Sequence, residues 1–324
     1  MLKIGSLSLD SPLILAPLSG ISDLPFRLIN RLFGCELAFT EMISASSLVH
    51  QSRTTGRMLV TVPLDRPLGI QLLGNDPDIV QRAFDIIASR EFDVVDLNAA
   101  CPVPKVTRKG EGAALLHHPQ KLRDILKALV TRARVPVTVK IRSGWDETSV
   151  NARDVALHAQ DAGISAVFIH GRTKEQGYSG SVDYRIIGEV KKALSIPLIA
   201  SGDILSPLLI RRMFEETGCD GVTIARGALG NPWIFRQADA FLKHGRIPEP
   251  PAVSEIVFIM KKHLDMVYSY YGERAGTVLF RKFFVWYGRG ISHVKHLRDL
   301  VFRAQTRDEM MRIIDALSAS PESV

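Results

Sequence analysis

Short apolar runs recur between residues 13 and 227, about 30 residues apart, and predict the strands of a single sheet. The runs are rich in β-branched and aliphatic residues, as is typical of parallel strands that are buried on both faces. Segments with helical periodicity fill the intervals between them. The predicted strands are 13–20, 37–42, 67–74, 94–100, 136–144, 166–173, 197–203 and 221–227.

The intervening helices have well-marked ends. Three dipeptides predict an N-cap followed by proline at the first helical position: Asp76-Pro77, Ser206-Pro207 and Asn231-Pro232. Three glycines lie where helices are expected to stop: Gly163, Gly218 and Gly245. Eight strands alternating with helices predict an α/β fold, a (β/α)8 TIM barrel. A doubly wound open sheet is the alternative. The even repeats and the lack of a G-x-G-x-x-G after the first strand argue against it.

The pattern changes after Gly245. A proline-rich linker, "RIPEPPAVS" (246–254), is followed by helical periodicity without strand signals. The predicted helices are 254–271, 276–288, 293–303 and 307–317, and Thr306 with Glu309 forms a capping box before the last one. We therefore expect a TIM-barrel catalytic domain at 1–245 and a small all-α helical bundle domain at 246–324.

Composition narrows the class of protein. No apolar run approaches the roughly 20 residues of a membrane helix, and the N-terminus has no apolar signal core. We therefore expect a cytoplasmic protein without membrane contact. The cysteines show no paired spacing, which argues against disulfides and a metal site; they are Cys35, Cys101 and Cys219. The net charge of +7 permits a polyanionic partner without requiring one.

Polar residues cluster on one face of several predicted strands, near their C-terminal ends. In "VTVKIR" (137–142) the aliphatic residues share one face and Thr138, Lys140 and Arg142 share the other. A single polar residue of this kind usually has a structural role, and a lone lysine usually reaches solvent. Four at equivalent positions favour a site at the C-terminal mouth of the barrel: Gln71, Asn98, Lys140 and His170.

Three further features point to the same mouth. Glycine-containing turns follow the last two strands, "SGDI" (201–204) and "ARGALG" (225–230), and such turns can hold a phosphate. Ordinary turn glycines are an equally good interpretation from composition alone. Cys101 follows the fourth strand, where a thiol can act as nucleophile or proton donor. Cys35 and Cys219 are interpreted as small buried apolar residues.

Several segments resemble the tRNA-dihydrouridine synthases, most closely the bacterial B type. The likeness runs in register over nearly the whole chain, including "FRKFFVWY" (280–287) in the tail. The combination of "HGRT…Q.Y.G" with "N..CP..K" is specific, because flavin barrels in general do not carry both. The segments in the barrel are "APLSGISDLPFR" (16–27), "QLLGNDP" (71–77), "DLNAACPVPKV" (96–106), "VKIRSGW" (139–145), "HGRTKEQGYSG" (170–180), "SGDI" (201–204) and "ARGALGNPWIF" (225–235).

This resemblance implies tightly bound FMN, reduced by NADPH, and reduction of the C5–C6 double bond of a specific uridine in tRNA to 5,6-dihydrouridine. Hydride would pass to C6, and Cys101 would be the catalytic residue that protonates C5. Lys140 would lie near the flavin edge that gains negative charge on reduction. The residues implied in FMN binding are Pro17, Leu18, Ser19, Gln71, Lys140, His170, Ser201, Gly202, Asp203, Ala225 and Arg226.

The resemblance also implies that the barrel domain at 1–245 binds FMN and that the helical domain at 246–324 binds tRNA. The uracil must leave its stack to meet the flavin, and the basic segment after Cys101 would meet the RNA phosphates. In the tail, Arg281 and Lys282 beside the aromatic residues of "FFVWY" are expected to offer charge and stacking. A monomer that binds tRNA and no metal is expected. The residues implied in substrate binding are Asn98, Lys105, Arg142, Arg172 and Thr173.

Three positions depart from the usual pattern of the family. "NAACP" stands where "NMGCP" is more common, "SGD" where "NGD" is, and "ARG" where "GRG" is. Ala225 still offers its backbone N–H, whereas Ser201 reaches less far than asparagine. The departures leave Cys101, Lys140 and His170 in place.

Two other hypotheses stay open at this point. One is an FMN-dependent TIM-barrel oxidoreductase acting on a small molecule, similar to dihydroorotate dehydrogenase. It leaves the basic tail and the segment 105–109 unexplained. The other is a non-catalytic RNA-binding protein on a barrel that has lost activity, which the intact Cys101, Lys140 and His170 argue against. The sequence does not specify which uridine is reduced.

Overall fold

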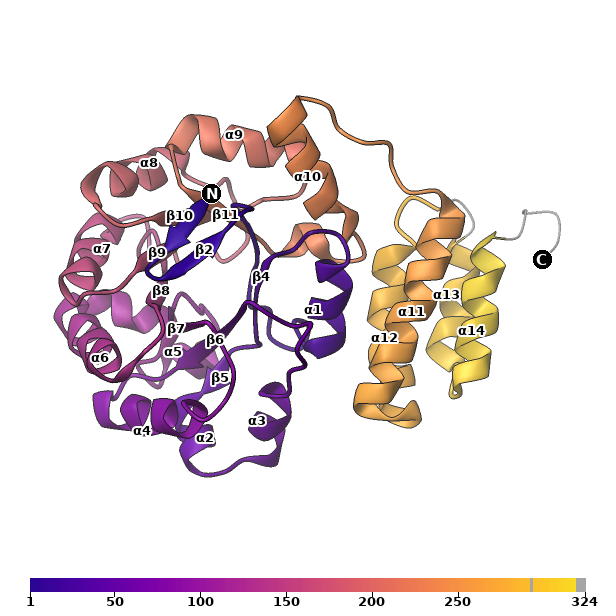
Figure 1. Cartoon of the computed structure of the whole chain (residues 1–324), viewed down its shortest axis with the longest axis horizontal. Coiled ribbons are helices and arrows are strands. Elements are labelled where there is room, and N and C mark those ends of the chain that lie inside the picture. Colours follow the sequence, from indigo (N-terminus) through magenta and orange to yellow (C-terminus); the bar gives the residue numbers. More distant parts are fainter. Residues whose placement is uncertain (292–293, 319–324) are drawn as a thin grey trace.

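The computed structural model describes residues 1–291 and 294–318, and within them eight parallel strands form a closed barrel followed by a bundle of helices (Figure 1). The pairing order is β4–β3–β11–β10–β9–β8–β7–β6, and pairing of β4 with β6 closes the ring. The predicted TIM barrel is therefore confirmed. The strands are β3 (Leu13–Leu15), β4 (Leu37–Phe39), β6 (Leu68–Leu73), β7 (Val94–Ala99), β8 (Val137–Arg142), β9 (Ala166–His170), β10 (Leu198–Ser201) and β11 (Gly221–Ile224).

Each of these strands lies inside a predicted run and ends before that run does. The predicted run 13–20, for example, is a strand only over Leu13–Leu15, and the run 221–227 only over Gly221–Ile224. The remaining residues of each run belong to the loops at the C-terminal ends of the strands. Many of these residues are only partly buried, and several of them line the mouth of the barrel.

A short hairpin closes the opposite end of the barrel. It consists of β1 (Leu2–Ile4) and β2 (Leu7–Leu9), which the sequence pattern did not indicate. Its buried side chains pack with inward-facing residues from the N-terminal halves of the strands, where the rings of Phe39 and Phe168 lie 5.4 Å apart. Each hairpin strand has only three residues, which is too short for an alternating pattern to stand out. Because the hairpin closes one end, the open mouth of the barrel lies at the C-terminal ends of the strands.

Amphipathic helices surround the barrel. In α4 (Pro77–Ile87) the buried residues Val80, Ala83, Phe84 and Ile87 recur at helical spacing and face the strands. The other covering helices are α1 (Leu24–Arg31), α6 (Pro119–Arg132), α7 (Ala152–Asp161), α8 (Tyr184–Ala193), α9 (Pro207–Thr217) and α10 (Trp233–His244). Shorter turns of helix and strand lie in the connecting loops: β5 (Ile43–Ser44), α2 (Ala45–Val49), α3 (Arg53–Met58), α5 (Pro104–Thr107), η1 (Gly112–His117) and η2 (Arg226–Ala228).

Most of the predicted helix ends are confirmed. The side chains of Asp76 and Ser206 accept hydrogen bonds from backbone amides in the first turns of α4 and α9. Gly218 and Gly245 end their helices in the left-handed conformation. The prediction for Asn231 is wrong, because α10 begins one residue later and has Pro232 at its N-cap. The Asn231 amide donates instead to the carbonyl of Gly227, within the preceding turn.

Beyond α10, the described residues contain helices and no strands, as predicted. The helices are α11 (Val253–Tyr271), α12 (Glu273–Tyr287), α13 (Val294–Arg303) and α14 (Arg307–Asp315), followed by the short η3 (Ala316–Ser318). The capping box of Thr306 and Glu309 is confirmed at the start of α14. Residue 293 of the predicted third helix and residues 319–324 of the predicted second domain lie outside the described residues. No helix among the described residues is long and apolar enough to cross a membrane.

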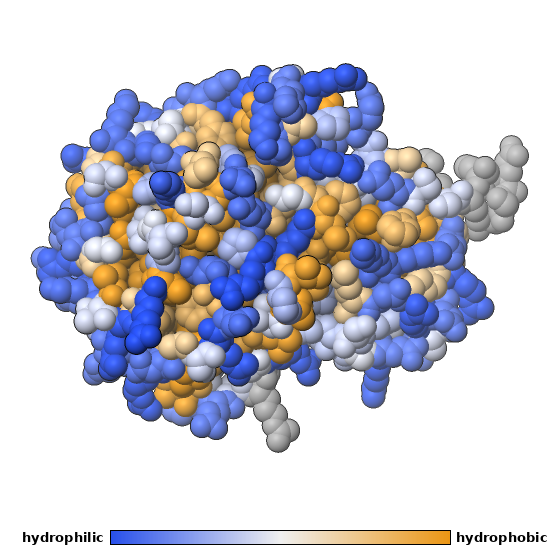
Figure 2. Space-filling model, viewed as in Figure 1, coloured by the Kyte–Doolittle hydropathy of each residue, from blue (hydrophilic) through white to orange (hydrophobic). Residues whose placement is uncertain are grey.

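The bundle packs against α1 and α10 of the barrel (Figure 1). Phe26 of α1 stacks on Phe283 of α12 with ring centroids 5.9 Å apart, and the Trp233 indole of α10 donates to Glu255 of α11 at 2.6 Å. Gly230 lies so close to α12 that a Cβ atom there would be 2.3 Å from the backbone of Trp286. Hydrophobic residues are visible at this junction in Figure 2.

Several of the tail residues expected to contact RNA take part in packing. Phe283, Phe284 and Tyr287 are buried in the bundle. Arg281 donates to the carbonyl of Ala304, and Lys282 donates to a carbonyl in the barrel. The expectation that this segment offers charge and stacking to RNA stays a prediction, since Arg281, Lys282 and Trp286 are only partly buried. An aromatic-rich helical segment is more often a core, and the buried aromatic residues form the core that joins the two parts of the chain.

Candidate active site

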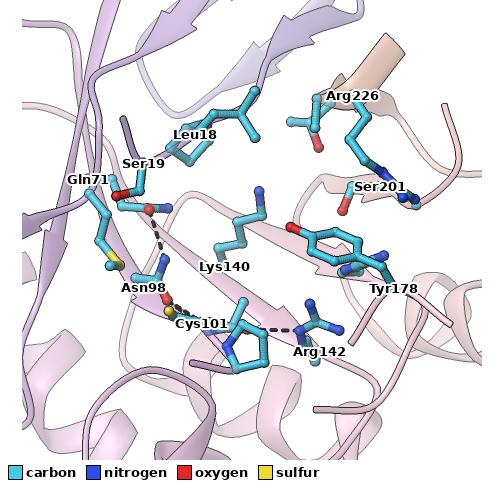
Figure 3. A pocket seen from close by; sticks show the side chains of 18 of the residues that line it. Leu18, Ser19, Gln71, Asn98, Cys101, Lys140, Arg142, Tyr178, Ser201 and Arg226 are labelled. Atoms are coloured by element: carbon cyan, nitrogen blue, oxygen red, sulfur yellow. Dashed lines mark hydrogen bonds between the residues drawn. The ribbon is translucent and has the colours of Figure 1, made fainter. Parts of the chain in front are cut away.

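A cavity of about 320 Å³ opens at the C-terminal mouth of the barrel (Figure 3). This volume is in the range of small-molecule and cofactor sites. Its walls come from the loops after six of the eight barrel strands and from the strand ends themselves. The residues expected at a cofactor that line it are Pro17, Leu18, Ser19, Gln71, Lys140, His170, Ser201, Gly202, Asp203, Ala225 and Arg226.

The floor of the cavity holds a continuous chain of hydrogen bonds. Thr138 Oγ1 and Gln71 Nε2 each donate to the carboxylate of Asp96 at 2.7 Å. Asn98 Nδ2 donates to Gln71 Oε1 at 2.8 Å, and Asn98 Oδ1 accepts the amide of Cys101 at 2.8 Å. The strand register sets this chain, because Gln71, Asp96 and Thr138 are direct neighbours on β6, β7 and β8. The acceptor-only carboxylate therefore fixes which way each amide points.

Lys140 projects into the cavity from β8, between the loop of Leu18 and Ser19 and the opposite wall (Figure 3). Burial lowers the pKa of its ammonium group to about 8, with Asp96 opposing this and Arg142 adding to it. Burial also raises the pKa of Asp96 to about 6, against the hydrogen bonds from Gln71 and Thr138. At neutral pH the pair remains ionised, and the cation faces the space where a ligand would lie.

Cys101 lies at the edge of the cavity and is partly exposed. Burial raises the pKa of its thiol, and the amide of Val103 and the charge of Arg142 partly oppose that rise. The protonated thiol is therefore the resting form at neutral pH. Arg142 itself is buried, and its guanidinium donates to the carbonyl oxygens of Ala100, Thr173 and Gly177.

The turns after β10 and β11 form the other side of the cavity. No hydrogen bond links the amides of Gly202, Asp203, Ala225 or Arg226 to another of the described residues. Gly202 has φ +121°, and a Cβ atom there would be 2.6 Å from Val182 and 2.9 Å from the His170 ring. The turn thus depends on glycine and presents free amides, as an anion site does.

Arginines hold this turn in place. Arg172 binds both carboxylate oxygens of Asp203, at 2.5 and 3.0 Å, and Arg226 binds one of them at 2.7 Å. The hydrogen bonds and charge of Arg172 keep the pKa of Asp203 below its ordinary value. Arg226 also lies 4.6 Å from the ring centroid of Tyr178, a cation–π contact at the cavity rim.

His170 of β9 is buried beside the turn that follows β10. Its Nε2 atom is buried and has no hydrogen-bond partner among the described residues. Burial, together with the charges of Arg142, Lys140, Arg172 and Arg226, lowers the pKa of the imidazole well below its ordinary value. The neutral ring therefore has one polar nitrogen free for a ligand, which is a costly arrangement in a buried site without one.

The residues expected at the substrate divide into two groups. Asn98 and Arg142 line the cavity. Lys105 is exposed on α5, just outside it. Arg172 and Thr173 are buried behind the wall, where Arg172 holds Asp203 and Thr173 exchanges hydrogen bonds with Gln176. The Ser201 hydroxyl donates to the carbonyl of Ile169, so its short side chain is already used within the barrel.

Other lining residues were not singled out from the sequence. Tyr178 had a signal, since it belongs to the "Q.Y.G" segment, and Met42 is the last residue of a predicted strand. Asp96 lies two positions before Asn98 and therefore on the same face of the strand. This alternation could have indicated that Asp96 lies beneath the floor of the cavity. The remaining lining residues carry little chemistry of their own; they are Ile21, Ala100, Pro102, Val103, Ile204, Leu205 and Thr223.

Two solved structures share the fold of this barrel. An old yellow enzyme homologue from Zymomonas mobilis superposes with a TM-score of 0.54 at 13% identity, covering 76% of this chain and 93% of that one. A 6-hydroxypseudooxynicotine amine oxidase from Pseudomonas geniculata gives 0.60 at 14% identity, covering 80% and 52%. At such low identity these similarities show a shared barrel fold and no more.

The sequence comparisons are more specific. The family "Dihydrouridine synthase (Dus)" matches residues 14–321. The "Probable tRNA-dihydrouridine synthase 1" of Synechocystis sp. is 38% identical, covering 97% of this chain and 88% of the relative. The "tRNA-dihydrouridine synthase B" of Vibrio cholerae is 36% identical, covering 97% and 98%, and that of Pseudomonas aeruginosa is 37% identical, covering 95% and 93%. The chain belongs to the dihydrouridine synthase family.

Proposed function

We propose that this protein reduces the C5–C6 double bond of a specific uridine in tRNA to 5,6-dihydrouridine, with bound FMN as cofactor and NADPH as reductant. Family membership over nearly the whole chain supports the reaction. The observation that carries the proposal is the position of the protonated Cys101 thiol at the edge of a cationic cavity, beside a basic surface segment.

The residues around the cavity suit FMN. The free amides of the turns after β10 and β11, together with Arg226, suit the phosphate. The unpartnered Nε2 of His170 and the ammonium of Lys140 suit the polar edge of an isoalloxazine ring that gains negative charge on reduction. When bound, FMN supplies the hydride that the C6 atom of the uracil receives.

Cys101 supplies the proton. The new C–H bond at C5 forms as the S–H bond breaks, and the electrons of that bond remain on sulfur. The raised thiol pKa keeps the donor protonated beforehand. The positive charge of Arg142 and the amide of Val103 stabilise the thiolate that is left, and solvent then restores its proton.

The surface beside Cys101 suits RNA. Lys105, Arg108 and Lys109 are exposed on and after α5, which begins three residues beyond the thiol. RNA phosphates bound there would bring an unstacked uridine to the mouth of the cavity. Asn98 and Arg142 are proposed to contact that uridine. For Arg172 and Thr173 we propose a positioning role in place of the direct contact expected earlier, because both are buried behind the wall.

Two further parts of the proposal follow from the substrate and from the site. A tRNA-modifying enzyme would act in the cytoplasm, where its substrate is. We also propose that the protein acts as a monomer, since one barrel supplies the whole set of residues proposed to hold FMN.

The test is an assay with purified protein, FMN, NADPH and an unmodified tRNA transcript, with dihydrouridine mapped position by position. The wild type should convert one position or a few. Cys101→Ala should still bind FMN and oxidise NADPH, yet reduce tRNA about 10²–10⁴ times more slowly. Cys35→Ala, which changes a buried cysteine far from the cavity, is the matched control and should retain activity.

Normal tRNA reduction by Cys101→Ala would exclude the proton-donor role. A wild-type protein that reduces no tRNA position but reduces a small unsaturated acid would favour the small-molecule oxidoreductase. A protein that binds tRNA and never binds FMN would favour the non-catalytic hypothesis.

A further inference from the structure

The loop between β3 and α1 forms one wall of the cavity. Pro17, Leu18, Ser19 and Ile21 of this loop line it, and Figure 3 shows Leu18 and Ser19 facing Lys140. The loop carries no strand pairing of its own beyond Ala16, which donates to the carbonyl of Ile224. Hydrogen bonds between Leu18 and Ser22 close a turn within the loop, and further contacts reach the loop from other parts of the chain.

One such contact comes from the C-terminal bundle. Lys282 of α12 donates through Nζ to the carbonyl oxygen of Gly20. The amide of Gly20 donates in turn to the carboxylate of Glu41, which follows β4. The backbone at Gly20, with φ +71°, is thus held on both sides by side chains of opposite charge.

A second contact lies at the other end of the loop. The Tyr271 hydroxyl of α11 donates to Asp23 Oδ2 at 2.9 Å. Asp23 Oδ1 accepts the amide of Phe26 at 2.9 Å and caps α1. The ring of Phe26 then stacks on Phe283 of the bundle, so helix, cap and loop are all fixed from the same side.

From these contacts we infer that the C-terminal bundle is part of the cofactor site, and that Lys282 and Tyr271 are positioning residues that hold the loop wall in the shape that accepts FMN. The inference relies on the proposed function for the identity of the ligand. The bundle would then do more than pack against the barrel, because its docking would also complete the wall of the cavity. Neither residue touches the cavity itself.

Lys282 lies near two carboxylates, so its positive charge matters for the loop as well as its size. Burial lowers the pKa of Lys282, while the nearby carboxylates of Asp23 and Glu41 oppose that change. Asp23 itself is buried, and burial raises its pKa to about 6. A methionine at position 282 would fill similar space but leave the Gly20 carbonyl without its donor and the two carboxylates without a nearby cation.

Two measurements test this with the full-length protein. Hydrogen–deuterium exchange of the peptide that covers residues 17–23 is measured without FMN, and the Kd for FMN is measured from quenching of flavin fluorescence. Lys282→Met should raise exchange in this peptide severalfold and weaken FMN binding about tenfold. Tyr271→Phe should act in the same direction with a smaller effect, and Lys282→Arg, which keeps charge and donor, should restore most of the affinity.

The matched control is Lys262→Met. Lys262 is exposed on α11, so this variant removes the same charge from the bundle without touching the loop. It should leave both measurements unchanged, whereas any general electrostatic effect on an anionic ligand would appear in it too.

The two proposals fail in different ways. If the wild type does not bind FMN, the proposed function falls, and the exchange data still report whether the bundle holds the loop. Unchanged loop exchange and unchanged FMN affinity in Lys282→Met and Tyr271→Phe would overturn the inference. Equal losses of FMN affinity in Lys282→Met and Lys282→Arg, accompanied by faster exchange throughout the chain, would also overturn it, because they indicate general destabilisation.

Discussion

Asp96 shows how one side chain can organise several others. It is almost fully buried, accepts hydrogen bonds from Gln71 and Thr138, and through Gln71 sets the orientation of Asn98 and of the turn at Cys101. Burial makes its ionisation unfavourable, and its raised pKa of about 6 reflects this. Burial of an ionised carboxylate is unfavourable, and such unfavourable arrangements are expected mainly at functional sites.

This cost predicts a pH dependence of stability. The folded-state pKa of Asp96 lies above the ordinary value of 3.8, so the folded state binds the proton more tightly. Its contribution to the free energy of unfolding is therefore fully present below pH 4 and is lost as the pH rises through about 6, a change of about 3 kcal/mol. Asp96→Asn should lack this component.

The measurement is urea unfolding of the FMN-free protein at pH 4.5 and 7.5, values that bracket about 6. The difference between the two pH values should be smaller in Asp96→Asn than in the wild type. Asp23 titrates in the same range and cancels in the comparison. Asp161→Asn, at an exposed position on α7, is the control and should behave as the wild type. Identical pH profiles in wild type and Asp96→Asn would contradict the prediction.

Among the elements, the turn after β10 is under a tight steric constraint beside the cavity. Gly202 adopts φ +121° against Val182 and His170, and the next residue, Asp203, also has positive φ and is held by Arg172. The turn therefore requires both a glycine and a paired carboxylate to present its amides. A regular strand or helix end would place these groups elsewhere.

Replacing Gly202 should affect the affinity for FMN more than the stability of the folded protein. In Gly202→Ala the added methyl group would collide with Val182 and the His170 ring, and the turn must shift. We expect FMN affinity to fall at least about tenfold, measured by flavin fluorescence. Gly218→Ala is the matched control, because Gly218 also has positive φ but has open space around it at the end of α9.

The control should cost about 1 kcal/mol of stability and leave FMN binding unchanged. An FMN affinity for Gly202→Ala equal to that of the control would show that the turn does not hold the phosphate.

At the scale of the whole molecule, the barrel and the bundle share a core. Phe283 is buried with its ring 4.5 Å from that of His263 and 5.9 Å from that of Phe26 in the barrel. His263 is fully buried, and burial lowers the pKa of its imidazole to about 3, so it remains neutral within this aromatic cluster. An apolar junction of this kind favours a fixed arrangement of the two parts over independent motion.

This junction predicts a large effect from a single substitution. Phe283→Ala should lower the free energy of unfolding by about 3–5 kcal/mol, because it leaves a cavity where both parts of the chain meet. Phe302→Ala removes the same ring from a position that is 56% exposed on α13, and should change it by less than about 0.5 kcal/mol. Urea unfolding followed by circular dichroism compares the two. Equal effects would mean that the junction contributes little to stability.

The local sequence pattern alone was sufficient to predict much of the fold and part of the candidate site. Hydrophobic periodicity and helix-end signals depend on residues a few positions apart, so the order of strands and helices follows from them. Strand parity then brought Gln71, Asn98 and Lys140 to one mouth, because parallel strands of a barrel share a direction. The glycine turns and Cys101 follow those strands directly, and hence could be placed as well.

Other features were decided only by tertiary structure. Lys282 and Gly20 are distant in sequence, as are Tyr271 and Asp23, and no local period links such pairs. Arg172 and Thr173 follow a strand in the expected way, yet neither lines the cavity. Arg172 pairs with Asp203 of another loop, and the Thr173 hydroxyl accepts the amide of Gln176 in its own loop. Which polar residues face a ligand and which hold the wall depends on packing between distant segments, and that packing is fixed only when the whole chain has folded.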